Sequence, residues 1–389
     1  MSSQAIEYAK NLLNELRKNE PKLFEELCGC GCKTEQKTEN NEITINTNNA
    51  DLIYISNWKK NVSFNYVAEQ YVNVLMSMGL RVAKIDISDA KVKYNKPVLI
   101  HPINSFIVDK HYLPRASKLF GIEPVESDEI SDLFLSNYSR FNTVFTHSQF
   151  GVNVFKKYNI DVVFLPHTYH PLFLRSPRMP KHQFLRTILD EKVDNGYIYI
   201  LYFLWHSGSR KGADITARII SRLSNTHSNI KLVLKRKNVL DYYLDVIRIL
   251  TPHVEIAEDL TINDLIDLYD ISDIVLLTSR SEGFGLNGLE GLLRGKIVVV
   301  PDTDMIPYRN YCVTYNVSSS AYSYDRYNYF HVGKGIQPDE SDLYEKLSNV
   351  VENLDTYKLR FKNNVSNVLK EYSYYSISKI FDKYLVSEL

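Results

Sequence analysis

The chain has 389 residues, 46 of them basic and 46 acidic, so its formal net charge at pH 7 is zero. This balance argues against a protein whose main task is to bind nucleic acid or an anionic membrane. Hydrophobic residues make up 44% and charged residues 24%, which excludes an intrinsically disordered chain, and the length predicts two or three domains at about 150 residues each.

The sequence carries no sign of membrane insertion or export. No apolar run approaches the roughly 18–20 residues of a spanning helix, and no hydrophobic signal-peptide core begins the chain. We therefore expect a cytoplasmic protein.

Residues 1–49 are expected to form an appendage, with a helical part and a polar linker. Apolar residues recur there at helical spacing: Ile6, Ala9, Leu13 and Leu16. This amphipathic helix could dock on a partner, on a membrane surface as a peripheral contact, or on the chain's own body, which is the interpretation we favour. Cys28, Cys30 and Cys32 follow in the run CGCGC, either as a soft-metal or redox-sensitive cluster or as a Gly-rich hinge with incidental thiols. Their spacing matches no common zinc motif.

From residue 51, short β-rich runs alternate with helical segments. The predicted strands are 51–56, 81–87, 96–101, 143–148 and 161–167, with a helix at about 65–78. This alternation predicts a parallel sheet with helices on both faces. We assign residues 50–170 to a Rossmann-like N-terminal domain.

The alternation restarts after residue 195. The predicted strands are 197–205, 230–236, 253–257, 274–279 and 297–300, with helices at about 212–223, 239–250, 262–269 and 287–294. Thr261 is the expected N-cap of the third of these helices, and Gly295 is expected to end the fourth. Residues 171–371 thus form a second Rossmann-like domain, and we expect two doubly wound domains that face a cleft. Ligands bind such sheets beyond the carboxyl ends of the strands.

The most informative segment is 278–300, in which a strand runs through the turn SEGFG into a helix. Gly283 and Gly285 allow the backbone to approach a ligand closely. Amides that can point at an anion at the helix start belong to Phe284, Leu286 and Asn287. Glu282 precedes the helix and Glu290 lies about two turns into it. Since an anion repels carboxylates, each is expected to meet hydroxyl groups of a sugar or ribose; the alternative is two solvated glutamates beside a structural turn.

A second polar set follows the strand 197–205, in the segment SGSRKGAD. Arg210 and Lys211 stand directly before the next helix, after the small residues Gly208 and Ser209. Adjacent cations at a strand's carboxyl end suit a diphosphate, because Arg can bind two oxygens while Lys supplies a compact charge. The alternative is a solvated basic loop.

Together these motifs resemble the retaining glycosyltransferases of the group 1 family, which have the two-Rossmann-domain arrangement called GT-B. Glu282 and Glu290 match the family's Glu-x(7)-Glu pattern, and SRKGAD resembles its RKG loop. KPVLIH resembles the strand whose last residue, here His101, lies by the donor sugar. EYSYYSISKIFDKYL resembles the closing helix, so we expect residues 372–389 to pack back on the N-terminal domain. The resemblance covers nearly all of 51–389.

The resemblance implies a nucleoside-diphosphate sugar as donor and transfer with retention of the anomeric configuration. UDP- and GDP-sugars are the leading candidates for the donor. Lys211 and Arg210 would stabilise the departing diphosphate, so neither a metal ion nor another cofactor is expected. Glu282 and His101 would contact the donor sugar, and Glu290 the ribose. Further donor-binding candidates are Gly208, Ser209, Gly283, Phe284, Gly285, Leu286 and Asn287. The acceptor stays open among glycans, lipid-linked sugars, proteins and small molecules, and nucleic acid is not expected.

The sequence departs from the family in three places. SNWKKNVSFN stands where the family has a Gly-rich loop, and the linker PHTYHP predicts a stiffer hinge. Trp205 and His206 stand where the family has an Arg before the RKG lysine, so Arg210 is the candidate replacement.

Other interpretations stay open. A GT-B relative such as a sugar-nucleotide epimerase or phosphorylase would share the motifs, as would a non-catalytic nucleotide-sugar-binding protein. Apart from the resemblance, His101 would be taken as a hydrogen-bonded strand end, and we interpret His147 and His167 as structural.

Overall fold

The fold comes from a computed structural model, which describes residues 47, 49–59, 63–205, 208–237, 242–318 and 332–389. The expected N-terminal amphipathic helix, Cys28, Cys30, Cys32 and His206 lie outside these residues. The chain divides into two compact units. Unit 1 holds the described residues up to 123 together with 136–145 and 372–389, and unit 2 holds 124–135 and 146–371.

The first sheet has six strands in the order β2-β1-β3-β4-β5-β6. Its strands are β1 (Leu52–Ser56), β2 (Val82–Asp86), β3 (Val98–Ile100), β4 (Leu119–Ile122), β5 (Thr143–Thr146) and β6 (Val163–Phe164). Neighbouring strands from β2 to β5 pair in parallel. Strands β1, β3 and β4 are buried along their whole length, as expected for parallel strands covered on both faces.

Helices of the first part of the chain alternate with these strands. They are α3 (Ser63–Ser77), α4 (Ile103–Lys110), α5 (Asp132–Tyr138) and α6 (Gln149–Lys157), with short 3-10 turns η1 (Ile87–Asp89) and η2 (Pro171–Leu174). The helix and strands expected from residue 51 are present, and β4, α4, α5 and α6 are additional elements that the hydrophobic pattern did not reveal.

The last helix, α15 (Tyr374–Tyr384), is part of unit 1 and is followed by η4 (Val386–Glu388). Its Phe381 ring meets Tyr71 of α3 edge-on, with 5.5 Å between ring centroids, and lies 5.8 Å from Phe145 of β5. The Tyr374 hydroxyl donates a hydrogen bond to Gln70 at 2.7 Å. The core of unit 1 therefore joins residues that are more than 200 positions apart along the chain, such as Phe145 and Phe381.

The second sheet lies in unit 2, with six strands in the order β12-β11-β10-β7-β8-β9. Its strands are β7 (Ile198–Leu204), β8 (Ile230–Arg236), β9 (His253–Ile256), β10 (Ile274–Leu276), β11 (Ile297–Pro301) and β12 (Val313–Tyr315), all paired in parallel. A separate antiparallel pair is formed by β13 (Val317–Ser318) and β14 (Gln337–Pro338).

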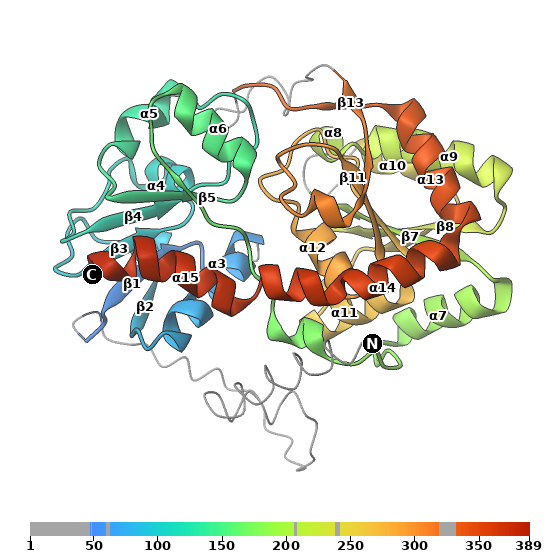
Figure 1. Cartoon of the computed structure of the whole chain (residues 1–389), viewed down its shortest axis with the longest axis horizontal. Coiled ribbons are helices and arrows are strands. Elements are labelled where there is room, and N and C mark those ends of the chain that lie inside the picture. Colours follow the sequence, from blue (N-terminus) through green and yellow to red (C-terminus); the bar gives the residue numbers. More distant parts are fainter. Residues whose placement is uncertain (1–46, 48, 60–62, 206–207, 238–241, 319–331) are drawn as a thin grey trace, which may run out of the picture. The chain divides into compact units, whose positions relative to one another are not determined.

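Helices cover both faces of the second sheet (Figure 1). They are α7 (Gln183–Asn195), α8 (Gly208–Lys211), α9 (Ala213–Thr226), α10 (Tyr242–Leu250), α11 (Ile262–Ile271), α12 (Leu286–Leu293), α13 (Glu340–Glu352) and α14 (Leu354–Glu371), with the 3-10 turn η3 (Arg309–Tyr311). Helices α9, α10 and α13 pack on one face, while α7, α11, α12 and α14 lie on the other. The two parallel sheets with their helices confirm the predicted α/β fold class.

Helix boundaries in unit 2 follow the expected signals. The Thr261 hydroxyl accepts a hydrogen bond from the Asp264 amide and caps α11, which confirms the predicted N-cap. Gly295 has φ of +66° directly after α12, a conformation that glycine adopts without strain. The expected stop at Gly295 is thus confirmed.

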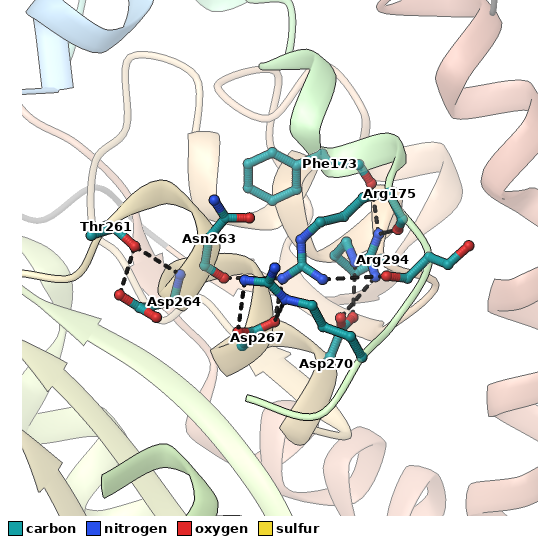
Figure 2. A network of polar contacts seen from close by, with 10 residues as sticks. Phe173, Arg175, Thr261, Asn263, Asp264, Asp267, Asp270 and Arg294 are labelled. Carbon is teal, nitrogen blue, oxygen red and sulfur yellow. Dashed lines mark hydrogen bonds and ion pairs between the residues drawn. The ribbon is translucent and has the colours of Figure 1, made fainter. Parts of the chain in front are cut away.

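A segment within unit 2, at residues 173–175, is fastened to α11 and α12 (Figure 2). The Arg294 guanidinium donates to the carbonyls of Phe173 and Arg175 at 2.7 and 2.6 Å and pairs with Asp270 at 2.8 Å. The Arg175 side chain pairs in turn with the fully buried Asp267. Buried carbonyls and carboxylates that all have cationic donors resist separation, because breaking one pair leaves a desolvated charge.

Two loops of unit 2 meet because of the strand order. β7 and β10 are neighbours in the sheet, although they are far apart in sequence. β7 leads into α8, and β10 leads through residues 277–285 into α12. Strand order reverses at this place, which is where doubly wound sheets bind ligands.

The surroundings of Gly212 show how closely these two loops approach each other. Gly212 has φ of +70°, and a Cβ atom there would lie 2.0 Å from the Thr278 carbonyl oxygen. Gly196 has φ of +63°, but a Cβ atom added there would have no heavy atom within 4 Å, so it is a matched control. We expect Gly196→Ala to lower the free energy of unfolding by about 1 kcal/mol through backbone strain alone. Gly212→Ala should cost more than about 3 kcal/mol, because the backbone must also move. Denaturant unfolding measures both, and equal losses would contradict the close approach.

Candidate active site

Lys211 and Glu282 form an ion pair where the two loops meet. The Lys211 ammonium lies 2.5 Å from Glu282 Oε1, and that same oxygen accepts a hydrogen bond from the Ser279 hydroxyl at 2.6 Å. Glu282 is only 6% exposed. The two residues are 71 positions apart, and the adjacency of β7 and β10 brings them together.

Arg210 is buried beside this pair. Its guanidinium donates to the Ser281 carbonyl at 2.9 Å and lies 3.7 Å from Glu282 Oε2. It also lies 3.4 Å from Glu126 Oε1. Arg210 therefore faces the turn at 279–285 rather than solvent, which excludes the interpretation of residues 210–211 as a solvated basic loop.

The environment of Lys211 shifts its protonation equilibrium. Burial lowers the pKa of the Lys211 ammonium below its ordinary value, and the charge of Arg210 lowers it further. The ion pair with Glu282 acts in the opposite direction and favours the charged form. A partly desolvated ammonium that keeps its charge through a carboxylate partner is suited to bind an incoming anion.

The small residues of the first loop fix the backbone that carries these cations. Gly208 is buried, and the Ser209 carbonyl accepts a hydrogen bond from the Arg280 guanidinium at 2.7 Å. Arg280 also pairs with Asp214 through two hydrogen bonds of 2.8 and 2.9 Å. The second loop thus holds the first in place through a bidentate ion pair, which is a rigid arrangement.

The turn SEGFG begins α12 as predicted. Gly285 has φ of +80° and is the N-cap of α12, and its carbonyl accepts a hydrogen bond from the Tyr308 hydroxyl. A Cβ on Gly285 would lie 2.7 Å from that hydroxyl oxygen, so the position requires glycine. Leu286 and Asn287 form the half-buried first turn of the helix, where backbone amides favour an anion.

Phe284 and Gly283 of the turn contact other segments of unit 2. Phe284 is buried and stacks on the His167 ring, with 4.2 Å between centroids and 26° between planes. His147 meets His167 edge-on at 4.2 Å. A Cβ on Gly283 would lie 3.1 Å from Pro124 Cβ, so residue 124 and the turn pack closely.

Glu290 lies on the buried side of α12. It is 3% exposed, and its carboxylate accepts a hydrogen bond from the Tyr269 hydroxyl at 2.7 Å. Tyr269 is on α11, and its hydroxyl also lies 3.3 Å from the Asn287 carbonyl. A solvated glutamate is therefore excluded at position 290 as well.

His101 is the predicted site residue that lies in unit 1. It follows β3, is fully buried, and shares a hydrogen bond of 2.9 Å between its Nδ1 atom and the Tyr54 hydroxyl. The rings of Phe64 and Tyr71 lie 6.1 and 6.0 Å from its own. This environment fixes the orientation of the imidazole within unit 1.

Sequence reasoning missed several residues of the site. Glu126 and Ser281 were not interpreted, yet the Ser281 hydroxyl donates to the Glu126 carbonyl and the Glu126 side chain faces Arg210. One signal was present: Glu126 follows closely on a buried run that proves to be a parallel strand, β4, and ligands gather beyond the carboxyl ends of such strands. At the position of the family's missing arginine, the Trp205 ring lies near the ammonium groups of Lys235 and Lys237.

Neither a metal-ligand cluster nor a membrane-spanning helix is found among the described residues. In the part of the chain that the structure describes, no three His, Cys, Asp or Glu side chains are grouped so that they could hold a metal ion. Among the described helices, none has the length and apolar character needed to cross a bilayer. The thiol of Cys312 is buried, and burial raises its pKa well above the usual value.

Comparison with known proteins agrees with this geometry. Residues 192–309, within unit 2, match the model of the family described as "Glycosyl transferases group 1". This range contains both loops of the site and both glutamates of the Glu-x(7)-Glu pattern. The resemblance to group 1 glycosyltransferases stated from the motifs is thereby confirmed.

Two viral proteins are related to the chain along most of its length. "Uncharacterized protein 356" of Sulfolobus islandicus rod-shaped virus 1 is 24% identical over 359 residues, which cover 86% of this chain and 98% of the viral protein. "Putative glycosyltransferase 45" of a Sulfolobus islandicus filamentous virus is 24% identical over 286 residues, 70% of this chain and 75% of its own.

Solved structures share the fold at low sequence identity. A glycosyltransferase from Rickettsia africae superposes with a TM-score of 0.61 at 16% identity, covering 86% of this chain and 98% of its own. Anabaena Alr3699/HepE, solved with UDP and glucose, gives 0.58 at 12% identity, covering 87% and 100%. S. aureus TarM gives 0.52 at 12% identity and covers 74% of this chain, which spans 55% of TarM. These likenesses support the GT-B fold.

The pH dependence of stability tests the burial of His147. Burial lowers the pKa of His147 from 6.5 to about 4, although the Leu165 carbonyl at 3.0 Å from Nδ1 acts in the opposite direction. Between pH 6.5 and 4 the unfolded chain therefore binds more protons, so the folded state loses stability as pH falls, by about 2 kcal/mol between pH 6.5 and 5 from this group.

In His147→Asn, whose amide can replace Nδ1, the pH dependence of urea unfolding should be weaker by that amount. His111→Asn makes the same change at an exposed histidine and is the control. An undiminished pH dependence in His147→Asn would mean that His147 does not titrate as its burial requires.

Proposed function

We propose that this chain is a glycosyltransferase that moves a sugar from a nucleoside-diphosphate donor to an acceptor with retention of the anomeric configuration. UDP- and GDP-sugars are the leading candidates for the donor. One observation carries the proposal: Arg210, Lys211 and Glu282 meet at the switch point of the second sheet, directly before the start of α12. The family match over this region and the fold shared with UDP-bound structures support it.

The cations would act on the leaving group. As the bond between the anomeric carbon and the phosphate oxygen breaks, negative charge grows on the diphosphate. Lys211, Arg210 and the amides at the start of α12 are already oriented, so they stabilise that charge without reorganising. In the mechanism implied by the resemblance, the acceptor oxygen bonds to the same face of the anomeric carbon and its proton passes to a phosphate oxygen.

The remaining polar residues would bind the donor. Glu282 is held by Lys211 and Ser279 in a fixed orientation and would accept hydrogen bonds from sugar hydroxyls. Glu290, oriented by Tyr269, would accept from ribose hydroxyls. We also propose that His101, whose Nδ1 is engaged by Tyr54, presents its other edge to the donor sugar. Because Arg210 and Lys211 supply positive charge at the diphosphate, we propose that transfer does not need a divalent cation.

Replacement of Lys211 tests the catalytic role. Lys211→Met keeps most of the side-chain volume but removes the charge, and we expect turnover to fall by about 10²–10³, the usual loss for one preorganised donor. Lys231→Met is the matched control, because Lys231 and Lys211 each pair with a glutamate and each side chain is 17% exposed. Lys231 lies near the amino end of β8, away from the site.

Lys211→Met should unfold at the lower denaturant concentration of the two, because it leaves the buried Glu282 without its cation, while Glu191 is 36% exposed. Under conditions in which both variants are folded, only Lys211→Met should lose transfer. Equal turnover in Lys211→Met and in the unmodified protein would remove Lys211 from the site.

Ligand-induced stabilisation tests the donor class. We expect UDP, GDP or ADP to raise the free energy of unfolding, by about 2.7 kcal/mol at one hundred times its Kd, because the ligand binds only the folded state. The measurement is a thermal shift with each nucleotide and its sugar. Incubation of the same labelled sugars without acceptor then separates the alternatives, since isomerisation indicates an epimerase and phosphate-dependent breakdown a phosphorylase. Absence of any shift would contradict a nucleotide-sugar enzyme.

A further inference from the structure

The turn before α12 places one side chain between two glycines. Phe284 stands between Gly283 and Gly285, and Gly285 has φ of +80°. Glycine has no Cβ, so its backbone has more conformational freedom than that of any other residue. Phe284 is 2% exposed, so among residues 283–285 the packing of this one side chain fixes the middle of the turn.

His167 supplies an aromatic face on which Phe284 rests. The two rings stack with 4.2 Å between centroids and 26° between planes. Aromatic rings that pack in this way stabilise each other beyond the burial of their surface. Tyr308 meets the Phe284 ring at 5.5 Å and 60°, and its hydroxyl donates to the Gly285 carbonyl. Two aromatic neighbours therefore hold Phe284, and one of them also bonds to the backbone of the turn.

His167 is itself held by a neighbouring segment of unit 2. Its ring meets the His147 ring edge-on, with 4.2 Å between centroids. His147 is 1% exposed, and its Nδ1 atom lies 3.0 Å from the Leu165 carbonyl oxygen. The Leu165 amide donates to the Thr146 carbonyl at 2.8 Å, which joins the two segments that carry the histidines. These contacts keep His167 in place without using the turn.

The turn determines where two parts of the proposed donor site lie. Glu282 comes directly before residues 283–285, and the amides of Leu286 and Asn287, in the first turn of α12, come directly after them. A change in the backbone of the turn would therefore shift the carboxylate and the amides relative to the two cations. A misplacement of about 1 Å can cost about 10²-fold in turnover. Donor binding thus requires that the conformation of this turn is held.

We propose that His167 is a positioning residue, which fixes the turn 283–285 through the stacked ring of Phe284. The turn then presents Glu282 and the first amides of α12 to the donor. This inference rests on the proposed function, because it assigns the ligand of the turn to that donor. His167 acts through the face of its ring, so a phenyl ring can replace the imidazole, whereas a polar side chain without a ring cannot.

The test measures the Kd for inorganic pyrophosphate by calorimetry. Pyrophosphate has the phosphate groups of the leaving group without base or sugar. His167→Asn keeps a polar side chain but removes the ring, and its Kd should be about tenfold higher than that of the unmodified protein, which corresponds to the loss of one aromatic pair. His167→Phe keeps the ring and should have the Kd of the unmodified protein.

Tyr197→Asn is the matched control. Tyr197 stacks on Tyr199 with 6.1 Å between centroids and 16° between planes, at the amino end of β7, whereas the site lies at the carboxyl end. This variant also loses a stacked aromatic ring, so its free energy of unfolding should fall, but its Kd for pyrophosphate should not change. A Kd that rises equally in Tyr197→Asn would show an effect of stability alone and would overturn the proposal.

A double-mutant cycle tests whether His167 acts through Phe284. Phe284→Leu keeps an apolar side chain without the stacked ring and should also raise the Kd about tenfold. The double variant should bind pyrophosphate no more weakly than either single variant, because both changes break the same contact. Additive losses would overturn the action through Phe284. If His167→Asn does not fold, Phe284→Leu alone decides, and an unchanged Kd in that variant overturns the proposal.

Failure of this proposal and failure of the proposed function give different results. If pyrophosphate binds the unmodified protein, His167→Asn and Phe284→Leu with the same Kd, the positioning role is overturned, and the turnover of Lys211→Met still decides the proposed function. Equal losses of affinity in His167→Phe and His167→Asn would assign the role to the imidazole nitrogens and overturn the stacking. If neither pyrophosphate nor any nucleoside diphosphate binds the unmodified protein, both proposals fail.

Discussion

The site depends on one constraint of the second sheet: β7 and β10 are parallel neighbours although 69 residues separate their ends. This pairing brings the loop after each strand to the same edge of the sheet. The Thr278 hydroxyl then bonds with the carbonyls of Lys211 and Gly212, at 3.0 and 2.9 Å, and the Tyr202 hydroxyl also donates to the Lys211 carbonyl. The cationic residues are thus held by backbone contacts that do not involve their own charges.

Such backbone support matters because buried charges are expensive to maintain. An ion pair such as Lys211 with Glu282 contributes little to stability once the desolvation of both groups is counted. Its value lies in orientation: charges that are already placed can act on a ligand without rearrangement of solvent. The ion pair of Arg280 with Asp214 has a different role, since it links the two loops and supports the main chain.

The hydrophobic pattern predicted five of the six strands of the second sheet, because apolar runs such as β7 and β11 alternate with amphipathic helices, but it did not predict the three-residue strand β12. β8 has the expected bounds, and α12 begins within one residue of its predicted start. Strand β4 escaped notice because LFGI is short and interrupted by Gly121, whose absent side chain makes room for Ile103. The motifs indicated Lys211 and Glu282 separately, but their pairing depends on strand order, which no local pattern specifies. The position of Glu126 after β4 was a signal that it could lie near a ligand, but its contact with Arg210 could not be predicted, since that contact arises from packing between segments 84 residues apart.

The place of α15 has a consequence for synthesis of the protein on the ribosome. Phe381 fills space between Tyr71 and Phe145, so the core of unit 1 is incomplete until residues 372–389 have been translated. Domains generally fold as units while the chain emerges from its amino end. Here unit 2 has all of its residues before unit 1 does. Residues 50–123 of unit 1 therefore stay partly unpacked until residues 372–389 have been translated.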